Sequence, residues 1–414
     1  MPPSNPAQPV KLLNAAVIVA ALGYFVDIYD LLLFGFVRQK SLLSLGFTPE
    51  QAFDVGLSLQ NWQMFGMLVG GLLWGVLGDK RGRVSVLYFS IALYSIANIL
   101  NGFASGYTDY ALFRFIAGIG LAGELGAGIT LVAEVLPKEK RGLGTMLVAS
   151  IGLSGALLAW VIDKTFDWRY CYFIGGGLGI VLLLVRISVS ESGIFREVKS
   201  QAHISRGNFF ALFTSWDRFT RFLRCIFIGT TTWFVIGVLV FFAPEFGKAK
   251  GLTGILAGNA IAIAYVGLII GDLASGLLSQ YLRSRTKVML SFLALDALAI
   301  WVYLAAPFSS PALFYTSHFV LGFSVGFWVI FVTIGAEQFG TNLRSTVATS
   351  VPNFARGMQV PINESFKYLK GAAVTGSVIT ASYIVGAVCL AIAFLALWGM
   401  KDTFETDMDY VEEV

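Results

Sequence analysis

Twelve apolar runs, each about 20 residues long or longer, dominate this sequence and limit the folds open to it. They lie at roughly 11–37, 54–78, 84–104, 108–136, 142–163, 170–189, 223–243, 254–280, 287–307, 311–335, 347–369 and 375–399. A helix needs about 20 apolar residues to cross a bilayer, and backbone groups in lipid must be satisfied within the protein. The runs are too long for the roughly ten-residue strands of a membrane barrel. We therefore predict an all-α membrane protein with twelve transmembrane helices in a lipid bilayer.

The composition excludes most soluble classes of protein. Hydrophobic residues make up 56% of the 414 residues and charged residues only 13%, about half of the roughly 25% that a soluble domain carries. Such a chain cannot coat a water-facing surface, which argues against a soluble enzyme, a nucleic-acid binder and a disordered scaffold. The three cysteines lie in apolar runs and predict neither a disulfide framework nor a metal site. The first run is too long for a cleavable signal peptide, and it contains Asp27 and Asp30.

The lysines and arginines orient the predicted spans. If both termini are cytoplasmic, 19 of the 29 basic residues fall in inner segments and eight at outer ends. Basic residues concentrate on the cytoplasmic side of membrane proteins. We therefore predict a multi-pass protein of the cytoplasmic (inner) membrane with both termini inside, and we expect a monomer.

The longest polar segment follows the sixth run and divides the spans six and six. Its mixture of Arg, Ser, Phe and Asp predicts a short cytoplasmic linker with amphipathic helix character. The predicted divisions are a first six-helix bundle at 1–189, the linker at 190–222, a second six-helix bundle at 223–400 and an acidic cytoplasmic tail at 401–414.

The two halves also repeat a short motif. An Ala-Glu pair ending at Glu134 is followed seven residues later by Arg141, and a second pair ending at Glu337 is followed by Arg344 at the same spacing. Duplicated helical halves are typical of secondary transporters, whose binding site lies between the halves near the middle of the membrane. The repeat therefore predicts two pseudo-symmetric bundles with a site between them.

The most specific motif is the segment GVLGDKRGR at Gly75–Arg83, in the loop after the second run. It resembles the Gly-x-x-x-Asp-Arg/Lys-x-Gly-Arg pattern of the major facilitator superfamily, and the resemblance extends to the topology of the whole chain. That resemblance implies a cytoplasmic gate that closes when the binding site faces outward. The residues it assigns to the gate are Gly75, Asp79, Arg83, Glu134 and Arg141, with Glu337 and Arg344 in the second half. Alternatively, the bases of this loop only hold it on the cytoplasmic side.

The segment Gly118–Gly123 spells the dinucleotide-binding fingerprint Gly-x-Gly-x-x-Gly. The fingerprint has that meaning only between a strand and a helix of a soluble unit. Inside a membrane helix, small residues instead allow close packing of neighbouring helices. We therefore predict helix packing here, and no cofactor or metal for the protein.

A few ionisable residues lie inside the predicted spans. A charge in lipid costs several kcal/mol unless it is paired or hydrated, so such residues are candidates for function. The candidates we select are Asp27, Asp30, Arg114, Glu124, Arg356 and Glu364; Asp272 and Asp296 also fall within spans, and we interpret Asp296 as structural. Because these residues come from both halves and fall at similar depths, they favour a charged site between the bundles.

This set narrows the family resemblance. The Asp-x-Tyr-Asp pattern of the first span, with Arg114 and Glu124 ten residues apart in the fourth, is similar to proton-coupled branches that import organic acids, sialic acid or phosphate. The seventh span lacks an acid, and Arg356 stands where the phosphate carriers have lysine. The signature that follows the sixth span in sugar carriers is degraded at 190–193. Phosphate and simple sugars are therefore disfavoured as substrates.

A mechanism follows from the charges themselves. A carboxylate in a poorly hydrated cavity favours its protonated form, whereas a neighbouring arginine favours the ionised form. An anion that takes over the arginine would free the carboxylate to bind a proton. We assign proton coupling to Asp27, Asp30 or Glu124 and anion binding to Arg114 or Arg356. Alternatively, Asp27, Asp30 and Arg114 form a fixed structural pairing between the first and fourth spans.

Other polar and aromatic residues of the spans could contact the substrate, although each could equally serve helix packing. The candidates are Tyr29, Gln60, Gln63, Trp233, Asn353 and Gln359. The sequence thus predicts a secondary active transporter that imports a small organic anion with protons by alternating access. An uncoupled facilitator or a drug or metabolite exporter of the same fold is the alternative. An integral-membrane enzyme is disfavoured, because the chain has two histidines and no nucleophile or metal motif.

Overall fold

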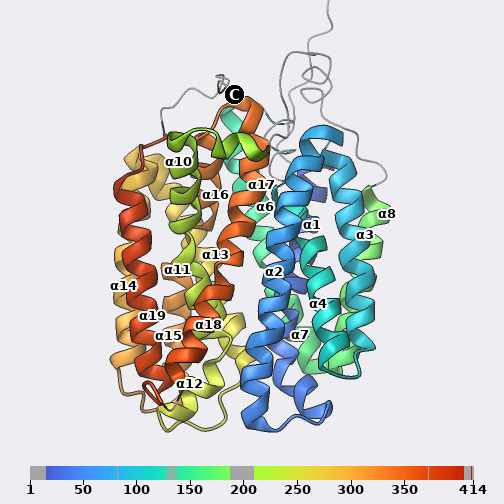
Figure 1. Ribbon diagram of the computed structural model, residues 1–414, viewed down its shortest axis with the longest axis vertical. Coiled ribbons are helices and arrows are strands. Elements are labelled where there is room, and N and C mark those ends of the chain that lie inside the picture. The colour runs from blue at the N-terminus through green and yellow to red at the C-terminus, as the bar shows by residue number, and fades with distance from the viewer. Residues whose placement is uncertain are drawn as a thin grey trace, which may run out of the picture.

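The computed structural model describes residues 15–81, 83–126, 128, 132, 136, 138–186, 209–371, 373–404 and 412. Within these residues every regular element is helical. The helices form two bundles that stand side by side (Figure 1). Their order along the chain follows the twelve predicted apolar runs.

The first bundle begins with a long helix that crosses its whole height. Its helices are α1 (Ala15–Ser44), α2 (Pro49–Arg81), α3 (Arg83–Gly102), α4 (Tyr107–Leu121), α6 (Lys138–Leu153), α7 (Gly155–Thr165) and α8 (Trp168–Arg186). Helices α6 and α7 form one span that is interrupted at Ser154. The bundle therefore contains six spans.

The second bundle has more interrupted spans than the first. Its elements are η1 (Phe209–Phe213), α10 (Trp216–Phe227), α11 (Thr230–Phe234), η2 (Val235–Val240), α12 (Ala243–Ala249), α13 (Ala257–Leu282), α14 (Arg285–Ala305), α15 (Pro311–Ser324), α16 (Trp328–Glu337), α17 (Thr341–Gly357), α18 (Gln359–Lys370) and α19 (Val378–Trp398). The seventh, tenth and eleventh spans each consist of two or more of these elements. The seventh passes through a π-helix, η2, a feature frequent at functional sites.

The molecule has two end faces, the linker end and the opposite end. The linker end is the face where α8 ends, α10 begins and α19 ends, at the top of Figure 1. The opposite end is the face where α1 ends and α12 lies, at the bottom of the same view.

Nine segments of the described helices are long and apolar enough to cross a membrane by length and composition alone. Three predicted spans fall outside this set: α2, α4, and α17 with α18. The described helix α4 is only 15 residues long. Helices α2 and α17 pack against each other between the two bundles. Helices α2 and α17 can be more polar because they face each other over part of their surface.

Glycines bring helices of the first bundle into backbone contact. A Cβ on Gly118 of α4 would collide with the carbonyl oxygen of Gln63 on α2, and one on Gly120 would collide with the backbone of Tyr94 on α3. The segment Gly118–Gly123 therefore serves close helix packing, as its place in a membrane span predicts.

Candidate substrate site

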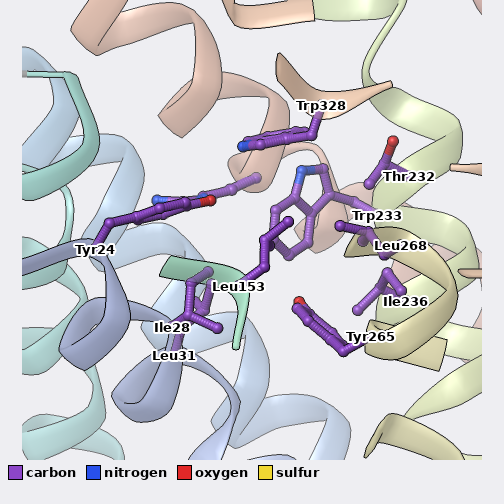
Figure 2. A pocket seen from close by; sticks show the side chains of 11 residues that line it. Tyr24, Ile28, Leu31, Leu153, Thr232, Trp233, Ile236, Tyr265, Leu268 and Trp328 are labelled. Atoms are coloured by element: carbon purple, nitrogen blue, oxygen red, sulfur yellow. The ribbon is translucent and has the colours of Figure 1, made fainter. Parts of the chain in front are cut away.

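A cavity lies between the two bundles and is lined by residues of both (Figure 2). The space free of atoms among its lining side chains, including space open to solvent, measures about 310 Å³. The lining residues are Tyr24, Ile28 and Leu31 of α1, Leu153 of α6, Thr232 and Trp233 of α11, Ile236 of η2, Tyr265 and Leu268 of α13, Trp328 of α16 and Arg356 of α17. Both bundles contribute to this wall, so a movement of one bundle against the other would open the cavity.

Arg356 is the charged residue of this lining, and it faces a carboxylate of the other bundle. Its Nη2 lies 3.9 Å from Oδ2 of Asp27, and the two side chains are only 1% and 0% exposed. Its Nη1 donates a hydrogen bond of 3.3 Å to Oδ1 of Asn353. The sequence predicted both Asp27 and Arg356 as site residues, and the fold places them together across the boundary between the bundles.

Aromatic rings surround the guanidinium group of Arg356. Its central carbon lies 5.7 Å from the ring centroids of both Trp233 and Trp328, within the range of cation–π attraction. The two indole rings are themselves 5.7 Å apart and cross at 81°. Tyr24 and Tyr265 extend the aromatic wall (Figure 2). The cavity thus combines one cation with a large apolar surface.

Trp328 owes its position to a break between α15 and α16. Ser324 at the end of α15 donates to Oδ1 of Asp296 at 2.9 Å, and Oδ1 of Asp272 accepts the backbone N–H of Val329 at 3.1 Å. Two buried acids therefore hold the two sides of the break. Sequence reasoning missed Trp328, because the break resets the helical phase of the residues that follow it.

Arg114 and Gln63 meet inside the first bundle, away from the cavity lining. Arg114 donates from Nη2 to Oε1 of Gln63, and its guanidinium carbon lies 4.6 Å from the ring centroid of Phe34. Tyr29 also points into this bundle, where its hydroxyl donates to the carbonyl oxygen of Cys171 at 2.8 Å. The cavity is lined instead by Tyr24, which lies more than one turn before Tyr29 on α1.

Asp30 and Glu124 are also buried within the first bundle. The carboxylate of Asp30 lies against Gly175 of α8. Glu124 forms an ion pair with Arg186 at the end of α8, and both side chains are nearly inaccessible. Arg186 also donates to the carbonyl oxygen of Val19 at 3.3 Å. Arg186 falls within the predicted run 170–189, a position that could have identified it as a buried charge.

Gln60 and its neighbour Asn61 connect the two bundles in the half of the molecule nearer the opposite end. Asn61 donates to Oε1 of Glu364 at 2.7 Å, and Asn363 donates to Asn61 at 2.8 Å and to Gln60 at 3.4 Å. These contacts join α2 to α18. Asn363 was not among the predicted site residues, although it lies on the same polar helix as Glu364.

Asn353 and Gln359 also lie at contacts between helices. Asn353 donates from its side-chain amide to the carbonyl oxygen of Ala122 at 2.8 Å, which joins α17 to the first bundle. Gln359 packs against Gly237 of η2, because a Cβ on Gly237 would collide with the side-chain amide of Gln359. Both side chains are buried, outside the cavity lining.

Charged pairs close the opposite end. Arg38 donates to Oε1 of Glu245 at 2.8 Å, and the Nζ of Lys370 lies 3.3 Å from Oδ1 of Asp54. Each pair joins one bundle to the other. Close to them, Phe53 packs edge-on against Phe242. These contacts hold the two bundles together at this end.

The predicted gate residues lie toward the linker end. Gly75 of α2 faces α17, where a Cβ would lie 3.6 Å from the carbonyl oxygen of Thr346. Glu337 pairs with Arg285 at 3.2 Å, and the Nε of Arg344 donates to the carbonyl oxygen of Ala336 at 3.2 Å. Glu134 and the side chains of Asp79, Arg83 and Arg141 lie outside the described part of the chain.

A polar cluster follows the last helix at the linker end. Asp402 lies beyond α19 and accepts hydrogen bonds from the hydroxyls of Ser284 and Thr286, and from the backbone N–H groups of Thr286 and Arg285. Partial burial opposes ionisation of this carboxyl group, but these hydrogen bonds hold its pKa below its usual value. Asp402 thus caps the start of α14.

Known proteins match this fold over most of its length. The family model described as Major Facilitator Superfamily matches residues 15–358. A putative metabolite transport protein of Haemophilus influenzae is 29% identical over 362 residues, which cover 83% of this chain and 86% of that protein. The putative niacin/nicotinamide transporter NiaP of Bacillus subtilis is 24% identical over 416 residues, which cover 98% and 99%.

A solved structure agrees with this assignment. The crystal structure of D-xylose-proton symporter matches with a TM-score of 0.72 at 17% identity, covering 95% of this chain and 99% of that one. The predicted fold class and the predicted family resemblance are therefore confirmed. This chain belongs to the Major Facilitator Superfamily, and it is a multi-pass membrane transporter rather than an enzyme.

Proposed function

We propose that this protein imports a small organic anion together with a proton, by alternating access of the cavity between the two bundles. The observation that carries the proposal is the pair Asp27–Arg356. It joins the bundles at 3.9 Å, and its arginine lines the aromatic cavity. A cation for the anion and an acid for the proton thus lie in one place.

The pair couples the two ligands through competition. Without substrate, the guanidinium of Arg356 favours the ionised form of Asp27. A substrate carboxylate that binds Arg356 weakens this attraction, because one cation then serves two anions. Asp27 is 0% exposed, so it then favours the protonated form. Anion and proton enter together, and the loaded cavity carries little uncompensated charge when the bundles move.

The walls of the cavity define the body of the substrate. Trp233, Trp328 and the two tyrosines favour a flat, apolar or aromatic group next to the carboxylate. A pyridine carboxylate such as niacin has this form, and the similarity to a putative niacin/nicotinamide transporter supports the substrate class. The cavity lining holds one cation, Arg356, which suits a monocarboxylate.

The setting of this activity completes the proposal. The distribution of lysine and arginine supports a cytoplasmic linker end, with both termini inside and the protein in the cytoplasmic membrane. The linker at 190–222 then joins the bundles 1–189 and 223–400 on the cytoplasmic side, where the tail 401–414 also lies. Because the cavity is built within one chain, we propose that a monomer is the transporting unit.

Uptake into proteoliposomes tests the coupling. With wild-type protein and a more acidic exterior, labelled nicotinate should accumulate above its external concentration. Asp27→Asn should keep nicotinate exchange between equal solutions but lose accumulation, because the mutant has no proton to carry at this position. Asp217→Asn is the matched control, since Asp217 is 75% exposed on α10 and far from the cavity lining.

Three outcomes would contradict the proposal. Equilibration without accumulation by the wild type would identify an uncoupled facilitator. Accumulation that survives in Asp27→Asn would remove Asp27 from proton coupling. Efflux of neutral or cationic drugs in preference to anion uptake would favour an exporter of the same fold.

A further inference from the structure

The cavity presents hydrogen-bond donors that the described protein leaves unpaired. Trp233 and Trp328 are 4% and 5% exposed, yet no described residue accepts a hydrogen bond from either indole nitrogen. The Nε of Arg356 likewise has no acceptor among the described residues. An indole and a guanidinium donate hydrogen bonds and accept none. Only acceptors can therefore satisfy these three groups.

The three donors lie within reach of one small molecule. The guanidinium carbon of Arg356 is 5.7 Å from each indole ring, and the rings are 5.7 Å from each other. Figure 2 shows the indole nitrogen of Trp233 on the edge directed toward Trp328. A carboxylate on Arg356 therefore brings the rest of a small ligand next to the indole N–H groups.

The remaining lining residues offer few acceptors in exchange. Five of the eleven are aliphatic, and they are Ile28, Leu31, Leu153, Ile236 and Leu268. The hydroxyls of Tyr24, Thr232 and Tyr265 can donate or accept, and Asp27 already faces Arg356. The lining thus offers more unpaired hydrogen-bond donors than acceptors, which favours a ligand that carries acceptors.

We propose that Trp233 and Trp328 determine specificity by selecting small organic acids that carry a second hydrogen-bond acceptor, such as a ring nitrogen or a carbonyl oxygen. This inference rests on the proposed anion site at Arg356 and narrows its substrate class. A ligand without the second acceptor would bury the indole N–H groups unpaired, which sites of this kind penalise.

Three acids of equal charge and nearly equal size test the inference. Benzoate has a carboxylate and no second acceptor, whereas nicotinate and isonicotinate each add a ring nitrogen. We expect the purified full-length protein to bind at least one pyridine acid about tenfold more tightly than benzoate, the effect of one hydrogen bond. Isothermal titration calorimetry gives the three dissociation constants.

Two variants assign the preference to the indole groups. Trp233→Phe and Trp328→Phe keep an aromatic ring and remove the N–H donor, so one of them should reduce the preference to about twofold or less while benzoate binds as in the wild type. Unchanged benzoate binding also reports an intact cavity. Trp301→Phe is the matched control, because Trp301 is 60% exposed on α14.

The outcomes separate this inference from the proposed function. Equal binding of all three acids by the wild type, or a preference that survives in both phenylalanine variants, overturns the role of the indole donors and leaves the anion site standing. If none of the three acids binds the wild type, the anion site itself is wrong, and the inference falls with it.

Discussion

Two buried ion pairs of this protein differ in what they join. Glu124 and Arg186 belong to the same bundle, and Arg186 is held further by the carbonyl oxygen of Val19. Asp27 and Arg356 belong to different bundles, and their nearest charged atoms are 3.9 Å apart beside a cavity. The first pair holds parts of one body together, whereas the second lies between two bodies.

This difference gives each pair a separate role. The pair inside one bundle is buried away from the cavity lining, so removing one partner leaves a buried charge without compensation. A pair between bundles can exchange its partner for a ligand, because opening the cavity separates its members. We therefore assign Glu124–Arg186 to stability and Asp27–Arg356 to transport. The following predictions test that division.

The largest effect is expected from Glu124→Gln. Removing one member of a buried ion pair typically costs about 3–5 kcal/mol, so this variant should unfold at a much lower temperature in detergent. Uptake per folded molecule should still respond to the pH gradient. The double variant Glu124→Gln with Arg186→Met should recover part of the lost stability, because it removes the unpaired charge. Loss of pH-driven uptake in a well-folded Glu124→Gln protein would reverse the assignment.

Arg356→Gln is the complementary change at the cavity. Loss of a hydrogen bond to a charged group costs about 1.5–3 kcal/mol, so the dissociation constant for nicotinate should rise by roughly 10- to 150-fold. Binding of nicotinate by calorimetry measures this effect. Arg356→Lys keeps the charge and should retain part of the affinity. Unaltered binding in Arg356→Gln would show that the anion binds elsewhere.

A smaller effect is expected at the opposite end, where Arg38 and Glu245 join the bundles. Glu245→Gln removes one contact between the bundles and should favour opening by about tenfold, the lower limit for losing a hydrogen bond to a charged group. A cysteine placed at Thr232 reports opening through its reaction with a membrane-impermeant maleimide added from outside. The exposed Asp167→Asn in the same background is the control. An equal labelling rate in both variants would contradict a closing role for this pair.

The smallest effect is expected for Asp402→Asn. Loss of a capping side chain typically costs about 1 kcal/mol, here at the start of α14. Because the pKa of Asp402 is lowered in the fold, its stabilisation is fully present above its unfolded value of 3.8 and is lost as the pH falls through the lower folded value. The difference in unfolding temperature between wild type and variant should therefore stay constant from about pH 5 to 8. A difference that changes over this range would contradict the capping role.

The sequence predicted the fold class because membrane insertion depends on local properties. Length, apolar content and the placement of basic residues can each be counted along the chain. The same counting selected Asp27 and Arg356 as candidates, since charges inside apolar runs are rare. It could not pair them, because the partner of a buried charge depends on the packing of helices distant in sequence.

Helical phase and interruption account for most of the remaining differences. Tyr29 was the predicted tyrosine of the site, yet Tyr24 lines the cavity and Tyr29 bonds to Cys171 inside the bundle. Trp328 follows a helix break whose position depends on Asp272 and Asp296 on other helices. Neither the rotation of α1 nor the break before α16 is encoded in the local pattern of apolar residues.

The glycine contacts of the first bundle have a mechanical consequence. Where Gly118 meets the carbonyl oxygen of Gln63 and Gly66 meets that of Phe115, α2 and α4 touch without intervening side chains. Side chains can change rotamer and absorb a displacement, whereas two backbones in contact have no such freedom. The bundle should therefore act as a stiff lever, so that a small shift of α1 at the cavity becomes a larger displacement at both membrane surfaces.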